Sequence, residues 1–466
     1  MKTAARITYS VVAGLVPVIL WAHKAGADPG HTAAPGEDPW ACSTSGCHTG
    51  LPKGGPLNAY GGKVSATFSN GSFYTPGQPV TIQVSVSDPV NSVWHGFQMS
   101  ARLDSDNSQA GTFRPTTGSV VFCADGSIEG TVRTRTGSCP NGQIEYITHT
   151  EPSTGTWTYS WIAPAGNVGP IHFYLAGNAV NHNDMEDAGD HVYTKAYVLN
   201  PLSALCTQTI PTISEVRRIE GWGDGNTFST GSWLQIKGSN LAPFTGPWLD
   251  ADFVDGVART SLAGTSVSIK GLPGAISYIS PTQINVQAPD DASTGPVPVS
   301  VTNCFGTSSP VTSANLQKTS LAPGLLAPPL SISPYFTGAG GKQYLAATIG
   351  FQNLFVGNVN PALPGLFQPA KPNDSILLYG IGFGATTPAN TPGVIATGQE
   401  LVNADIQVKF GTTPAAVTRA ALYPTFVGLY YIVVTVPNVA DDDYQINVTV
   451  AGQPLPSGPL FLTVHK

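Results

Sequence analysis

The stretch GQPVTIQVSVSDP, residues 77–89, decides the fold class of this 466-residue chain. Every second residue from Val80 to Val86 is Val or Ile, and the residues between them are polar. This period of two places all the apolar side chains on one face of a β-strand. The stretch GTWTYSWIAP, residues 155–164, repeats the pattern with aromatic side chains. Such strands pack one face on a core and turn the other toward solvent, as in a β-sandwich.

The composition agrees with this interpretation over the whole length. Only 11% of the residues are charged, while 52 Gly and 40 Pro favour short strands joined by tight turns. No long amphipathic helix is evident, so we expect an all-β chain, divided by its length into about three domains. The net charge is −7 and no run of Lys or Arg could contact phosphates, which excludes nucleic acid as a partner.

The N-terminus has the pattern of a secretory signal peptide. Lys2 and Arg6 precede an apolar stretch at residues 7–22, and small residues lead to a cleavage site predicted after Ala27. No other segment approaches the roughly 20 apolar residues that a membrane-spanning helix needs. We therefore expect an exported protein, secreted or at the cell surface, without a transmembrane span in its mature chain.

An exported protein is found in an oxidising compartment, where disulfides persist. We therefore expect disulfides among the six cysteines. Cys123 and Cys139 lie close in sequence, and Cys206 and Cys304 lie at the two ends of one predicted domain. We predict both pairs to be structural disulfides. The remaining two cysteines lie in the N-terminal stretch 38–50 and raise a different question.

The second half of the chain repeats itself at an offset of about 140 residues. Each copy ends in an alternating strand, so each is predicted to be an antiparallel sandwich. A Pro-rich segment at residues 321–336 separates them as a spacer. The matching stretches are GSNLAP (238–243) with GIGFGATTP (380–388), VSIKGLPGAI (267–276) with VKFGTTPAAV (408–417), and QINVQAP (283–289) with YIVVTVP (431–437).

The predicted architecture is therefore all-β, with three immunoglobulin-like or β-sandwich domains in tandem after a signal peptide and a short loop-rich Cys/His segment. The predicted boundaries are 1–27 for the signal peptide, 28–58 for the Cys/His segment, 59–202 for the first sandwich, 203–316 for the second, and 317–466 for the spacer with the third.

Two groups of motifs resemble known families. GSWLQIKGSNLAP (231–243), the stretch 260–291 and DSILLYGIGFGATTPA (374–389) are similar to a C-terminal module of secreted acidobacterial proteins. That module resembles tandem TIG-type immunoglobulin-like domains and would cover about residues 205–466. It has no assigned catalytic residues.

The upstream motifs resemble the reeler domain in the form found in secreted bacterial proteins. They are GFQMSARLDSDNSQAGTF (96–113), the stretch 145–181 and GDHVYTKAYVL (189–199). In that family a segment like GHTAAPGEDPWACSTSGCHTG (30–50), with a haem-type Cys and His motif, often stands just ahead. The resemblance implies a β-sandwich preceded by a haem-attachment segment.

The stretch DPWACSTSGCHTG, residues 38–50, contains the candidate cofactor-binding residues. A c-type haem is held by two Cys thioethers, and the adjacent His ligates the iron. Cys42, Cys47 and His48 have this order, although the usual C-x-x-C-H is lengthened to C-x-x-x-x-C-H. The alternative is a small Cys42–Cys47 disulfide beside an ordinary histidine. A zinc clip is disfavoured because no fourth ligand stands nearby.

A second axial ligand to the iron is an open question at this level. A His or Met in that position would suit electron transfer, which we expect, and a vacant position would suit small-ligand binding. The candidates are His31, His95, Met99, His149, His172, His182 and His191.

The stretch NHNDMEDAGDH, residues 181–191, is a second candidate site. It gathers Asp184, Glu186, Asp187 and Asp190, whose oxygens could bind calcium. Its spacing does not match the twelve-residue calcium loop, and a solvated turn is the alternative.

No motif of a hydrolase or a nucleotide-binding enzyme is present in the sequence, so we expect a non-enzyme. The first hypothesis is an exported monohaem cytochrome-like protein that exchanges electrons with a redox partner. The alternative is a surface adhesion or structural protein that binds polysaccharide or protein through its sandwiches, with Cys42–Cys47 a disulfide.

Overall fold

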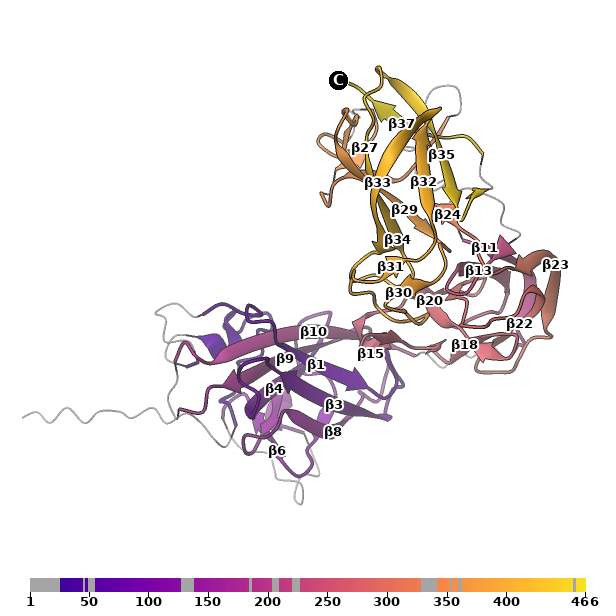
Figure 1. The fold of residues 1–466 in the computed structure, drawn as a ribbon. Coiled ribbons are helices and arrows are strands. Elements are labelled where there is room, and N and C mark those ends of the chain that lie inside the picture. The colour runs from indigo at the N-terminus through magenta and orange to yellow at the C-terminus, as the bar shows by residue number, and fades with distance from the viewer. Residues whose placement is uncertain are drawn as a thin grey trace, which may run out of the picture.

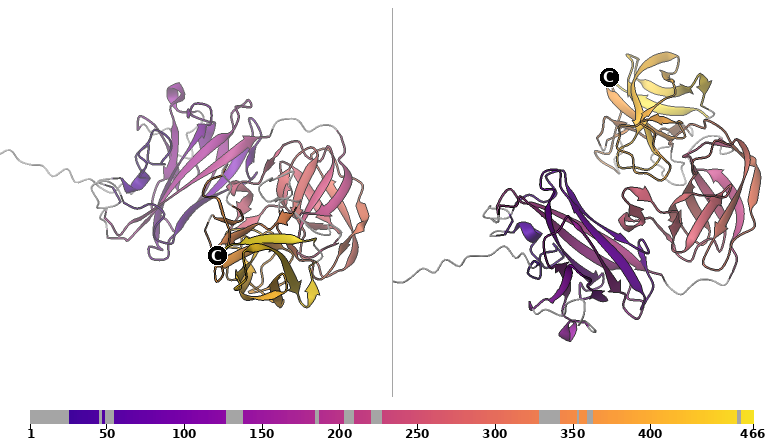
Figure 2. Two further views of the ribbon diagram at one scale, coloured as in Figure 1. Left: turned by 90° about the horizontal axis from the view of Figure 1, so that it is seen from above. Right: turned by 60° about the horizontal axis from the view of Figure 1, so that its bottom comes forward.

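The structure is a computed structural model and describes residues 26–44, 47–48, 55–126, 138–183, 187–202, 209–219, 227–327, 342–352, 354–358, 363–455 and 458–466. The expected all-β class is confirmed, because strands and three short 3-10 helices are the only regular elements in these ranges. Most of the predicted signal peptide lies outside the described residues. Within the described ranges no helix is long and apolar enough to cross a bilayer. Figures 1 and 2 show three β bodies that follow one another along the chain.

The first body is a two-sheet sandwich in which the opening stretch becomes β3 (Pro79–Ser87). Val80, Ile82, Val84 and Val86 are all buried, as the alternation predicts. One sheet has the order β1 (Lys63–Phe68), β3, β8 (Thr156–Ile162), β5 (Thr112–Arg114). The other has the order β2 (Phe73–Tyr74), β10 (His191–Pro201), β9 (Ile171–Val180), β4 (Trp94–Leu103), β7 (Glu145–His149), β6 (Ser119–Cys123).

The core between these sheets is rich in aromatic side chains. Trp157, Tyr159 and Trp161 of β8 all point inward. Trp161 is fully buried, and its indole N–H donates a hydrogen bond to the carbonyl oxygen of Ala110 at 2.9 Å. This bond satisfies the one polar atom that burial of a Trp side chain would otherwise leave without a partner.

The second body is a smaller sandwich with an outlying hairpin. The hairpin joins β15 (Phe253–Val254) to β16 (Val257–Ala258) and projects toward β10 (Figure 1). One sheet has the order β11 (Thr212–Arg218), β13 (Trp233–Ser239), β21 (Gln283–Gln287), β20 (Ala275–Ile279), β14 (Gly246–Pro247). The other has the order β12 (Thr227–Phe228), β23 (Val311–Lys318), β22 (Gly295–Thr302), β18 (Thr265–Ile269), β17 (Ser261–Leu262), with β19 (Leu272–Pro273) beside β18.

The third body is one continuous sheet that folds over its own core. Its long strand β33 (Thr413–Leu422) pairs first with β32 (Ile406–Phe410) and then with β34 (Tyr430–Thr435), and the β34 pairing contains a bulge between Val417 and Arg419. Such a strand turns the corner between two layers. The other strands are β24 (Gly324–Leu325), β25 (Gln343–Tyr344), β26 (Ala347–Ile349), β27 (Phe355–Val356), β28 (Phe367–Gln368), β29 (Ser375–Ile381), β30 (Thr386–Thr387), β31 (Leu401–Val402), β35 (Asp442–Val450), β36 (Gln453–Pro454) and β37 (Leu460–Val464).

The second and third bodies share one pairing scheme. The run β13–β21–β20 corresponds to β29–β34–β33, and the run β12–β23–β22–β18 corresponds to β25–β37–β35–β32. The first pair in each of the latter runs is parallel and the others are antiparallel. The sequence repeat therefore has a counterpart in strand pairing.

Candidate functional site

The N-terminal segment, residues 26–44, lies on the β4 face of the first sandwich and is held there by polar side chains. Gln98 in the middle of β4 is fully buried and makes three contacts with this segment. Its amide donates to the carbonyl oxygens of Ala27 at 3.0 Å and Asp28 at 2.8 Å, and its oxygen accepts the N–H of His31 at 2.8 Å. One strand residue thus satisfies three backbone groups of an otherwise irregular segment.

A buried ion pair holds the next turn of the segment. Glu37 pairs with Arg102 at the end of β4, and their side chains are only 7% and 5% exposed. The Glu37 carboxylate also accepts the hydroxyl of Tyr146 at 2.8 Å and the backbone N–H of Thr32 at 2.8 Å. With its charge paired and its oxygens hydrogen-bonded, Glu37 meets the conditions under which a buried carboxylate is tolerated. Sequence analysis did not single out Glu37.

The Cys/His stretch follows this anchored segment. The 3-10 helix η1 (Ala41–Ser43) contains Cys42, which packs against Ala176 of β9 and Val192 of β10 and is only 7% exposed. The backbone N–H of His48 donates to the carbonyl oxygen of Cys42 at 3.1 Å and thereby closes the loop between the two cysteines. This bond brings His48 next to Cys42 in space.

Cys42 and Cys47 are both thiols in this structure, and the Cys42–Cys47 disulfide of the alternative hypothesis is not formed. Burial, together with the nearby Cys47, raises the pKa of the Cys42 thiol to about 12. A thiol with such a pKa stays protonated at neutral pH and reacts slowly. Cys47 is half-buried.

The ring of His48 is oriented by a buried carboxylate. Its Nδ1 lies 2.7 Å from Oδ2 of Asp190, whose side chain is 1% exposed. The other carboxylate oxygen accepts the N–H of Asn181 at 3.0 Å. Asp190 directly precedes β10, so the sheet fixes its position. With Nδ1 engaged, Nε2 is the nitrogen left to coordinate a metal, an arrangement typical of metal-ligating histidines.

Three of the predicted second-ligand candidates make side-chain contacts of their own in the first sandwich. Met99 is fully buried in the sandwich core, where its sulfur accepts the hydroxyl of Tyr159 at 3.2 Å. His172 pairs with Asp104 at 2.7 Å on the surface. His191 stacks on Tyr60 with ring centroids 3.8 Å apart, and its Nδ1 lies 2.7 Å from Asp88.

The other four candidates differ in their surroundings. His182 packs edge-on against Trp94, and Nδ1 of His149 accepts the N–H of Phe97 at 3.1 Å. His31 Nδ1 and His95 Nε2 are buried without a hydrogen-bond partner among the described residues.

The acidic loop between β9 and β10 is held by its own hydrogen bonds. Asp187 accepts the side-chain amides of Asn181 and Asn183 and the N–H of Gly189. The bonds from Asn183 and Gly189 lower the pKa of Asp187. Asp184 and Glu186 lie outside the described residues. In the part of the chain that the structure describes, no group of three or more His, Cys, Asp or Glu side chains could hold a metal ion.

The predicted Cys123–Cys139 disulfide is confirmed, and the pairing of Cys206 with Cys304 stays a prediction. Cys123 at the end of β6 is joined to Cys139. Cys304 is disulfide-bonded as well, and its expected partner Cys206 lies outside the described residues.

Two family models match parts of the chain. Residues 46–177 match the family model of the Reeler domain. The second body matches the model of the IPT/TIG domain over residues 211–315. Among solved structures, the human F-spondin reeler domain (fragment 1) is 18% identical, with a TM-score of 0.20, and the match covers 30% of this chain and 88% of that one. No curated protein matches the chain.

Reeler and TIG domains are non-catalytic families typical of extracellular proteins. The chain is therefore a multidomain β protein of extracellular type, built from a Reeler domain, a TIG domain and a third β domain with the pairing scheme of the second. This composition fits a surface or structural role.

Proposed function

We propose that this chain is an exported surface protein that carries one c-type haem on its N-terminal segment. Cys42 and Cys47 would form the thioether bonds, and His48 Nε2 would ligate the iron. The observation that carries the proposal is the 2.7 Å contact between His48 Nδ1 and the buried Asp190, because metal-ligating histidines are commonly oriented by such a contact to their other ring nitrogen.

The donor set fits such a group. Both cysteines are thiols, and the backbone N–H of His48 donates to the carbonyl oxygen of Cys42. When bound, a c-type haem supplies one-electron transfer. The Asp190 carboxylate would fix the ring plane of His48 and make its Nε2 a better donor.

The burial of Cys42 dictates an order of events. A thiol that is 7% exposed and stays protonated cannot be reached once the segment has folded onto β9 and β10. Thioether formation at Cys42 would therefore precede docking of the segment. The Glu37–Arg102 pair and the Gln98 contacts would then hold the modified segment on the β4 face of the Reeler domain.

The family matches favour a second candidate function, adhesion through the β domains without any cofactor. In that case the two cysteines would be a disulfide in the exported protein. The Reeler and TIG domains would then supply the binding surfaces.

A pyridine haemochrome spectrum distinguishes the two functions. The full chain is exported from a host with c-type maturation and compared with Cys47→Ser, with His48→Ala and with the control His172→Ala. We expect a c-type spectrum in the parent and in His172→Ala, its weakening in Cys47→Ser, and an altered native spectrum in His48→Ala. A colourless parent protein with a Cys42–Cys47 disulfide would overturn the haem proposal in favour of adhesion.

A further inference from the structure

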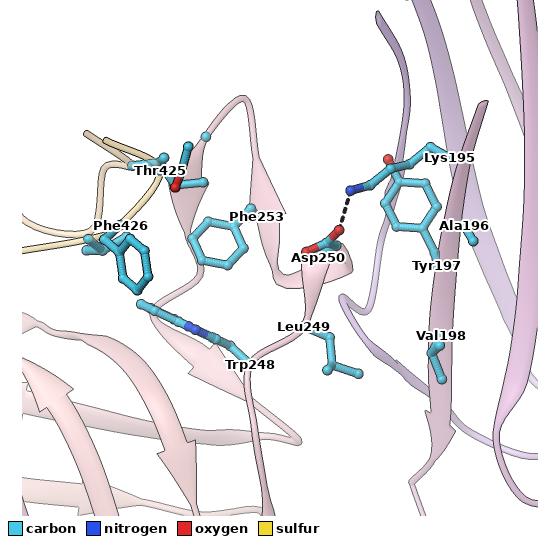
Figure 3. A pocket seen from close by; sticks show the side chains of 13 residues that line it. Lys195, Ala196, Tyr197, Val198, Trp248, Leu249, Asp250, Phe253, Thr425 and Phe426 are labelled. Carbon is cyan, nitrogen blue, oxygen red and sulfur yellow. Dashed lines mark ion pairs between the residues drawn. The ribbon is translucent and has the colours of Figure 1, made fainter. Parts of the chain in front are cut away.

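The three domains meet around one groove of about 640 Å³, which we call the junction groove. Figure 3 shows its two sides, with β10 of the Reeler domain opposite the segment from Trp248 to Phe253 of the TIG domain. The third domain closes one end with the loop that contains Phe426. Ligand sites occur preferentially at such domain interfaces, and this volume lies within their usual range.

Hydrogen bonds fix the Reeler wall of the groove to the TIG wall. Asp252 in the 3-10 helix η3 (Asp250–Asp252) is 1% exposed and accepts the N–H of Ser72 at 2.8 Å and its hydroxyl at 2.5 Å. Arg259 donates to the carbonyl oxygen of Phe68. Lys195 of β10 pairs with Asp250 across the groove (Figure 3).

The third domain is hydrogen-bonded to the TIG domain. The N–H of Ile395 donates to the carbonyl oxygen of Gly256 at 2.8 Å, and the indole of Trp233 donates to that of Val427 at 3.2 Å. The groove therefore has walls that are hydrogen-bonded to one another. A site whose walls are fixed before binding loses less entropy when a ligand enters.

Aromatic rings gather on one side of the groove. The centroids of Trp248 and Phe253 are 4.9 Å apart, and the ring of Phe426 stands beside them (Figure 3). Phe426 is 50% exposed, so its ring is accessible to a ligand in the groove. Ring faces carry negative partial charge and attract the polarised C–H groups of a ligand.

The charged groups that line the groove form an ion pair with no net charge. Lys195 and Asp250 are its two charged lining residues and they neutralise each other. Their side chains are 43% and 62% exposed, so both can still exchange hydrogen bonds with a ligand. A polyanion would also be opposed by the net charge of −7.

We propose that the junction groove binds a neutral oligosaccharide or the end of a neutral polysaccharide chain. The C–H face of a sugar ring would pack on Trp248, Phe253 and Phe426. Its hydroxyl groups would exchange hydrogen bonds with Lys195, Asp250 and the hydroxyl of Thr425. Pyranose rings present this combination of an apolar face and a polar edge. A purely apolar ligand could form no hydrogen bonds with the exposed Lys195–Asp250 pair.

Isothermal titration calorimetry of the full chain tests the site. The probes are cellohexaose, maltohexaose, xylohexaose and laminarihexaose as neutral sugars, with hexagalacturonic acid and chitosan hexamer as charged ones. We expect saturable binding of at least one neutral probe, and a loss of affinity of about tenfold or more in Phe426→Ala, equivalent to about 1.4 kcal/mol.

The matched control is Phe351→Ala. Phe351 is 61% exposed and, like Phe426, contacts Tyr423, but it does not line the groove. We expect it to bind as the parent does, with equal melting temperatures for all three proteins. The proposal is overturned if no neutral probe binds, if only charged probes bind, or if Phe426→Ala binds with parental affinity. A variant of the full chain without Cys42 and Cys47 should bind equally, which keeps the result separate from the haem proposal.

Discussion

His48 Nδ1 lies 2.7 Å from Oδ2 of Asp190, although 142 residues separate the two along the chain. The contact joins the Cys/His stretch to the start of β10, where the carboxylate is 1% exposed. A second pair of the same kind, His172 with Asp104, has the same 2.7 Å distance but lies on the surface. Removing the carboxylate from each pair in turn therefore shows how much burial adds to the stability that such a contact provides.

Removing the buried carboxylate should loosen the N-terminal segment. Asp190→Ala leaves the N–H of Asn181 and the ring of His48 without their acceptor, and each such loss costs about 1–3 kcal/mol in a buried site. Asp104→Ala should change stability by less than about 1 kcal/mol, because its pair is exposed. Hydrogen exchange of the peptides around residues 41–48 and β10 measures both. Equal protection in the two variants would contradict the structural role of Asp190.

The two N-terminal thiols should differ in reactivity in haem-free protein. A pKa of about 12 leaves roughly one part in ten thousand of Cys42 as thiolate at pH 8, and the side chain is buried. Cys47 is half-buried and should be alkylated first. Peptide mass spectrometry after brief iodoacetamide treatment checks the order, and denatured protein should be alkylated at both. Alkylation of Cys42 at the rate of Cys47 would show that the segment is not docked as described.

The Cys123–Cys139 disulfide should stabilise the Reeler domain. It closes a loop across a sequence separation of 16, for which chain entropy predicts about 3 kcal/mol. The double variant Cys123→Ala/Cys139→Ala should lower the melting transition of that domain in scanning calorimetry. Cys42→Ala is the matched control, since it removes a buried cysteine that is in no disulfide. A double variant that melts with the control would mean that the loop contributes nothing to folding.

Acid should destabilise the Reeler domain in two steps, of which the first belongs to His149. Burial lowers the pKa of His149 to about 4, from about 6.5 in an unfolded chain. Since the unfolded state takes up the proton first, stability is complete above pH 6.5 and falls by up to about 3 kcal/mol as the pH drops to 4. His149→Gln should flatten this decline in a pH series of thermal melts, whereas His172→Gln should not. A parent whose stability is constant from pH 6.5 to 4 would refute the assignment.

The second step belongs to Asp88 and lies at lower pH. Burial alone would raise the pKa of Asp88, but hydrogen bonds from Tyr193, Asn91 and His191 hold it at about 2. A carboxylate with a lowered pKa stabilises the fold above its unfolded pKa near 4 and loses that contribution as the pH falls toward 2. Asp88→Asn should therefore alter the melts below pH 4 and leave the slope between 6.5 and 4 unchanged. A changed slope in the upper window would show that the two steps are not separate.

The junction between the Reeler and TIG domains should depend on Asp252. Asp252→Ala leaves the buried Ser72 without an acceptor for its N–H and hydroxyl, so we expect the joint to open while each domain stays folded. Small-angle scattering of the variant should give a larger radius of gyration than the parent. Glu215→Ala, which removes an exposed carboxylate from the same domain, should not. An unchanged scattering curve for Asp252→Ala would contradict this account of the joint.

The fold class could be predicted because period-two alternation reports burial directly. In β3 and β8 each apolar residue points into the core, as the pattern requires. The same rule fails in β4, where Gln98, Ser100 and Arg102 alternate with apolar residues and would be expected to face water. They are buried because the N-terminal segment covers that face, and they hold its backbone and Glu37 in place. A local pattern carries no information about which distant segment lies on top of it.

Only the local part of the candidate site could be predicted from the sequence. The order Cys42, Cys47, His48 is a local motif, and it could be read from the sequence. Asp190 was noticed as a calcium candidate, but its contact with His48 depends on the packing of the N-terminal segment against β10. The junction groove was missed altogether, because it takes its lining from three domains that are far apart in sequence.

The central claim is tested most directly by the intact mass of the full chain, exported from a host with c-type maturation and measured under denaturing conditions. We predict the mass of the processed polypeptide plus one haem, lost when Cys42 and Cys47 are both replaced by Ser. The mass of the polypeptide alone, less two hydrogens for a Cys42–Cys47 disulfide, would contradict the account.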